Sequence, residues 1–79
     1  MIQYHIIEIQ NRADGINNVQ AIESRNSLAT GLSYFYQRCS TMAATELYPT
    51  VTLMLIDSGG HVIENKHLTT AYVAPTEGE

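Results

Sequence analysis

The pattern of hydrophobic and polar positions is clearest between positions 50 and 67, TVTLMLIDSGGHVIENKH, where two runs of strand-forming residues flank a turn. In an extended strand, Val51, Leu53 and Leu55 lie on one side, and the intervening residues, Met54 and Ile56 among them, lie on the other. Both sides are largely apolar, which favours a strand that is central or covered on both faces. An Asp-Ser-Gly-Gly turn and a more polar strand follow. The pattern predicts a β-hairpin.

A second alternating stretch, residues 2–10, predicts another strand. Its apolar side changes between Ile6 and Ile7. One explanation is a β-bulge, because one extra residue turns all later side chains to the other face. The other is a second buried face supplied by a partner chain. The sequence leaves both explanations open.

The hydrophobic period changes to that of a helix from Val19 onward. At 100° per residue, one arc of roughly 160° collects most apolar residues of this region. Its members are Ile22, Leu28, Ala29, Leu32, Phe35, Tyr36, Cys39, Met42 and Ala43. The pattern predicts a helix over about residues 18–44 that ends before Pro49. Such a helix would be roughly 40 Å long and would overhang a strand of about 26 Å, so its apolar stripe needs a bend or a partner.

These elements predict an α+β fold with the order β-α-β-β, in which one long helix packs on a three-stranded mixed sheet. The apolar middle strand favours the strand order 1-2-3, with 1-3-2 as the alternative. A right-handed crossover would make the first two strands parallel. Residues 1–73 would form a single domain, and residues 74–79 a disordered acidic tail. One face of such a sheet has no helix over it, and a second copy of the chain is the simplest cover.

Composition strengthens the expectation of association and excludes other partners. The chain has 79 residues, of which 44% are hydrophobic and 15% charged, so a lone monomer would bury a small core. We therefore predict a homo-oligomer, a dimer before any larger assembly. The formal net charge is −4 with only four Lys and Arg residues, which argues against nucleic acid and against an anionic membrane surface.

The sequence shows no recognisable membrane span or signal peptide. No run approaches the ~20 apolar residues of a membrane span, and MIQYHIIEIQ lacks the basic region and cleavage site of a signal peptide. With one cysteine, an internal disulfide cannot form. We expect a soluble protein of the cytoplasm.

Chemistry-bearing residues are few and scattered. His61 and His67 are about 20 Å apart on a straight strand, too far to bind one metal ion, and no third ligand accompanies His5. Cys39 falls in the apolar helix stripe with no histidine near it in sequence. The sequence therefore predicts no catalytic residue, no metal site and no cofactor, and it favours a non-enzymatic role.

An interaction or accessory protein that acts as a homo-oligomer is the function we expect first. The apolar strand residues without a predicted cover, together with an exposed helix tyrosine, are the candidate interface. They are Ile7, Ile9, Tyr34, Met54 and Ile56.

A small-molecule-binding module is the alternative, with a pocket between sheet and helix or between subunits. The residues expected to line it are Tyr4, Phe35, Tyr36 and Met54.

Overall fold

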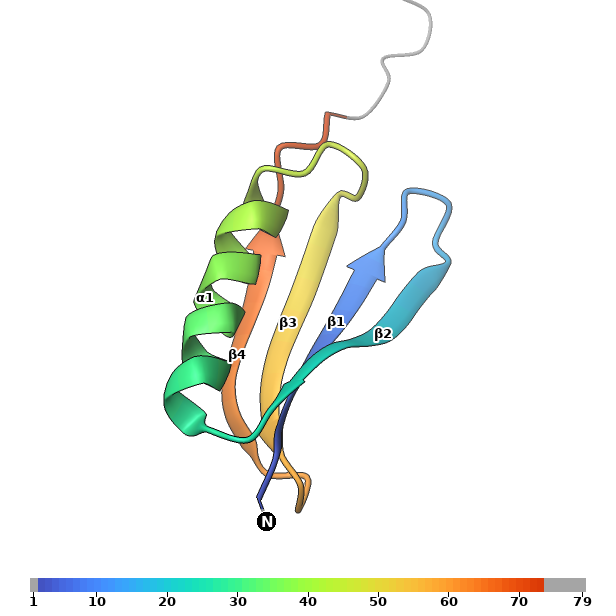
Figure 1. The fold of residues 1–79 in the computed structure, drawn as a ribbon. Coiled ribbons are helices and arrows are strands. Elements are labelled where there is room, and N and C mark those ends of the chain that lie inside the picture. Colours follow the sequence, from blue (N-terminus) through green and yellow to red (C-terminus); the bar gives the residue numbers. More distant parts are fainter. Residues whose placement is uncertain (1, 74–79) are drawn as a thin grey trace, which may run out of the picture.

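The computed structural model describes residues 2–73 and contains four strands and one helix. In chain order they are β1 (Tyr4–Asn11), β2 (Asn17–Arg25), α1 (Leu28–Ala43), β3 (Thr50–Asp57) and β4 (Val62–Thr69). The sheet order is β2-β1-β3-β4, and every neighbouring pair is antiparallel. The helix lies along one face of the sheet (Figure 1).

The first hairpin corrects the predicted fold. The three-stranded mixed sheet is wrong, because residues 17–25 form a strand that pairs with β1 and do not begin the helix. The turn between them is built on Asp14 and Gly15. The Asp14 carboxylate accepts the backbone N–H of Ile16 at 3.0 Å, and Gly15 has a φ of 86°, which glycine adopts without strain. The added strand reverses the chain before the helix, so β3 is antiparallel to β1. The helix connects β2 to β3, which run parallel to each other with β1 between them, and the predicted parallel pairing of the first two strands of a three-stranded sheet is absent from residues 2–73.

The helix is therefore shorter than predicted. It begins after the N-cap Ser27, whose carbonyl accepts the N–H of Gly31 at 2.9 Å, and ends at Ala43. Its 16 residues span roughly 24 Å, which matches strands of eight residues, so the overhang expected from the sequence does not occur.

The second hairpin is confirmed by the pairing of β3 with β4. Its turn is held by Asp57, whose carboxylate accepts the backbone N–H groups of Gly59 and His61, both at 2.9 Å. The hydrogen bond from the His61 backbone is the main reason that the pKa of Asp57 is lowered. Gly60 takes a φ of 83° in the same turn.

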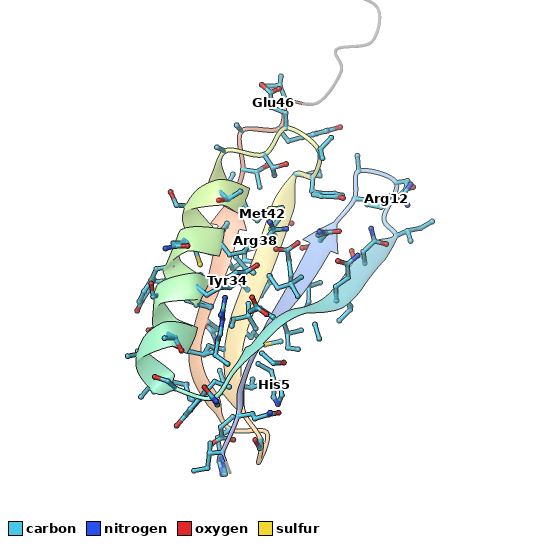
Figure 2. The ribbon with its side chains drawn as sticks, in the orientation of Figure 1. His5, Arg12, Tyr34, Arg38, Met42 and Glu46 are labelled. Carbon is cyan, nitrogen blue, oxygen red and sulfur yellow. The ribbon has the colours of Figure 1, made fainter. Side chains whose placement is uncertain are left out.

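The core lies between α1 and the covered face of the sheet. The fully or almost fully buried apolar side chains are Ile6, Phe35, Met42, Val51, Leu53 and Leu55. Figure 2 shows Met42 on the side of α1 that faces the sheet. Gly31 lets the helix come close, because a Cβ there would stand 3.3 Å from Tyr4 Cβ and 3.5 Å from Leu55 Cδ1.

Residues 2–73 form one α+β domain, and the predicted tail at 74–79 lies outside the described residues. No helix in the described part of the chain is long and apolar enough to cross a membrane.

Candidate functional site

One face of the sheet has the helix over it, and the opposite face has no element over it among residues 2–73 (Figure 1). Strand pairing fixes which side chains share this second face, because paired residues point to the same side of a sheet. We call it the open face. It consists of four rows across the sheet, each with one residue from β2, β1, β3 and β4 in that order. The rows are Asn17, Asn11, Thr50, Thr69; Val19, Ile9, Thr52, His67; Ala21, Ile7, Met54, Asn65; and Ser24, His5, Ile56, Val62.

An apolar band crosses the open face. Its centre is on the two inner strands, where Ile7 lies opposite Met54 and their side chains are only half-buried. Its ends reach the two edge strands, where Val19 is 66% exposed and Val62 is 54% exposed. The complete band is Val19, Ala21, Ile7, Ile9, Met54, Ile56 and Val62.

The open face carries no Asp, Glu, Lys or Arg among the described residues. The charged strand residues point to the helix side instead. They are Glu8, Glu23, Arg25, Asp57, Glu64 and Lys66. This separation of charged residues from the open face is informative, because the core of a protein interface differs from the rest of a surface in its lack of charged residues.

Two histidines flank the apolar band. His5 Nδ1 lies 2.8 Å from Ser24 Oγ, and His67 Nδ1 lies 2.7 Å from Thr52 Oγ1. A hydroxyl can donate to a neutral imidazole nitrogen or accept from a protonated one, so neither contact fixes the charge of the ring.

The structure excludes a bulge in β1, which was one of the two explanations for its change of apolar side. β1 pairs with β3 without a register shift, so β1 itself is not bulged there. The bulge in the first hairpin leaves Ile22 of β2 unpaired, opposite Ile6 and Ile7. The apolar side changes because Glu8 and Gln10 are buried on the helix side, while Ile7 and Ile9 lie on the open face.

The structure brings most of the candidate interface residues together. Ile7, Ile9, Met54 and Ile56 are neighbours at the centre of the open face. Tyr34 is separate from them, because it lies on α1 (Figure 2). The Arg25 guanidinium carbon is 5.4 Å from the centroid of its ring.

The candidate ligand-binding residues do not meet in one place. Phe35 is fully buried in the core, and Tyr4 packs against that core from the helix side. Tyr36 is 49% exposed, and the hydrogen bond that it donates to Glu64 Oε2 (3.2 Å) raises the pKa of its phenol. Met54 lies on the open face, across the sheet from all three.

Two of the hollows on the described surface are open to solvent. One, of about 220 Å³, is lined by Arg25, Thr30, Ser33, Tyr34 and Gln37. The other, of about 300 Å³, lies at the opposite end of the molecule and is lined by Arg12, Ala13, Asp14, Leu47, Tyr48 and Tyr72. Neither contains Tyr4, Phe35, Tyr36 or Met54.

A buried ion pair joins α1 to β1 and was not predicted from the sequence. Glu8 is fully buried, and Arg38 Nε and Nη2 donate to its two carboxylate oxygens at 2.6 and 3.1 Å. Gln10 Nε2 also donates to Glu8, and Gln10 Oε1 accepts from Asn18 at 3.4 Å. The bond to Glu8 raises the pKa of Arg38. The Glu8 carboxylate therefore accepts hydrogen bonds on both oxygens, and the pair connects the helix to the strand. Figure 2 labels Arg38 on α1.

Reactive groups do not gather elsewhere in the part of the chain that the structure describes. Burial raises the pKa of the Cys39 thiol, which disfavours the nucleophilic thiolate. Within residues 2–73, no group of three His, Cys, Asp or Glu side chains is placed to hold a metal ion.

Comparison of the chain with protein-family models, with curated proteins and with solved structures found no match.

Proposed function

We propose that the protein is a small homodimeric interaction protein, in which the open face of one copy packs on the open face of a second. The observation that carries this proposal is an apolar band on a sheet face without a charged residue among residues 2–73. Two such faces would pack about 10 Å apart, as the sheets of a β-sandwich do.

Self-association is favoured over a charged partner by the distribution of charge. The whole chain has a formal net charge of −4, so contact between copies brings like charges together unless the contact surface is neutral. The open face meets this condition, and a two-fold interface requires a surface that is complementary to itself. A basic or acidic partner would find no ion pair to form there.

The size of the face suits a dimer. Four strands about 4.8 Å apart, with eight residues of about 3.3 Å each, give a projected area of roughly 400–500 Å². This projection is a little over half of the about 800 Å² that each partner contributes to a standard interface, and the accessible surface of side chains exceeds the projection. Burial of the band would also add to a core of only six buried apolar residues.

A small-molecule site remains the second candidate from the sequence. Both hollows are open, and the residues expected to line a pocket lie on both faces of the sheet, with Phe35 buried in the core, so the geometry favours association over enclosure of a ligand. We propose the cytoplasm as the location, because the single cysteine is typical of a reducing compartment.

Sedimentation equilibrium at pH 8 tests the proposed function. We expect the mass of a dimer at micromolar concentration, with dissociation on dilution. A mass equal to that of one chain at all concentrations up to roughly 100 µM would contradict it, since an association that weak is worth little more than 5 kcal/mol.

A further inference from the structure

We propose that the dimer is regulated by pH through His5 and His67, and that it dissociates as the solution becomes acidic. This inference rests on the proposed function, because it assigns a charge switch to the same open face. Imidazole is the side chain that changes charge between pH 5 and 8.

The two histidines are the only titratable groups on the open face of residues 2–73. His5 has Ser24 of β2 on one side and Ile56 of β3 on the other. His67 has Thr52 of β3 on one side, and β4 is the edge of the sheet on the other. The helix packs on the opposite face. No carboxylate from any of these elements faces either ring, so none offsets the charge of an added proton.

The arrangement fixes the sign of the effect. In a face-to-face dimer, the partner presents the same two histidines and no carboxylate from its own open face. Protonation of both copies therefore adds up to four positive charges to an apolar interface. A buried charge without a partner is costly, and like charges across an interface repel. The dimer is favoured while the rings are neutral, and it loses stability as pH falls through the range in which they bind protons.

A general charge effect would have the opposite sign. Protonation of all three histidines would move the formal net charge from −4 to −1, which reduces repulsion between copies. Stronger association at acidic pH would follow from net charge alone, whereas weaker association follows from the placement of His5 and His67.

The experiment compares the dimer dissociation constant at pH 8.0 and pH 5.5 by sedimentation equilibrium, with far-UV circular dichroism to verify the fold at both values. We expect the dissociation constant of the wild type to rise at least ~10-fold at pH 5.5. The double variant His5→Gln/His67→Gln stays neutral and can still hydrogen-bond to the hydroxyls, so its constant should change less than about twofold. The single variants supply the same comparison if the double variant does not fold.

His61→Gln is the matched control. His61 lies in the β3–β4 turn with a side chain 81% exposed, and it is not part of the open face. This variant should keep the pH dependence of the wild type. A wild-type dimer with the same constant at both pH values, or a double variant that weakens as much as the wild type, overturns the pH switch and leaves the dimer in place. A monomer at pH 8.0 overturns the proposed function and the switch with it.

Discussion

Ile7→Lys should convert the proposed dimer to a monomer. Ile7 lies on an inner strand at the centre of the open face, next to Ala21 and Met54. In the dimer, the two introduced ammonium groups would be buried close to the two-fold axis, and like charges across an interface cost several kcal/mol. We expect the dissociation constant to rise more than ~100-fold, measured by sedimentation equilibrium at pH 8.

The monomer should tolerate this change. The Ile7 side chain is only half-buried, and the stem of a lysine can lie along apolar neighbours with its charge in water. Leu47→Lys is the matched control, because it makes the same substitution of charge at a 73% exposed apolar residue in the α1–β3 connection. Leu47→Lys should leave the dissociation constant within about twofold. A dimer that persists in Ile7→Lys would place the interface elsewhere, for example along the β4 edge.

Arg38→Met should destabilise the fold by about 3 kcal/mol, at fixed protein concentration. The substitution leaves the carboxylate of Glu8, which is fully buried, without its bidentate partner. Arg38 is itself 31% exposed, so water can reach part of the vacated space, and the expected cost is at the lower end of the range for buried pairs. Urea denaturation followed by circular dichroism measures it.

The double variant Glu8→Gln/Arg38→Met separates the lost charge from lost packing. Gln at position 8 is neutral and can still bond to Gln10, so removal of the buried charge should recover at least about half of the stability lost in Arg38→Met. If the double variant is as unstable as Arg38→Met alone, the cost comes from the packing of the arginine stem and the ion pair is not the cause.

The second hairpin could be predicted because its signals agree. Residues 50–56 are rich in β-branched and apolar side chains, and Pro49 blocks a helix that would continue from upstream. The Asp-Ser-Gly-Gly segment that follows is typical of a hairpin turn. Strand β1 was predicted for the same reason.

The first hairpin was missed because residues 17–25 satisfy two periods. Ile22 falls on the helical arc that continues to Leu28, and Gln20, Ala21 and Glu23 are ordinary helix residues. The bulge at Ile22 breaks the strand alternation that would have opposed this interpretation. The Asp14-Gly15 turn was the available signal, since such a pair between two alternating stretches is typical of a hairpin.

The open face could be predicted only in part. The sequence indicated two apolar sides for strands β1 and β3, and it grouped Ile7, Ile9, Met54 and Ile56. It could not show that every charged strand residue points the other way, because that depends on the register of β2 and β4. The Glu8–Arg38 pair was invisible for a similar reason, since its partners are 30 residues apart and on different elements.

The most direct test of the open face as the dimer interface is an isotope-filtered NOE experiment at pH 8 on mixed dimers, in which one copy carries labelled Ile and Met methyl groups. We expect intermolecular contacts at the methyls of Ile7, Ile9 and Met54. We expect none at Met42, because this residue of α1 is buried in the core between the helix and the sheet. Contacts confined to Ile63 of the edge strand β4, with none at Met54, would contradict the proposed interface.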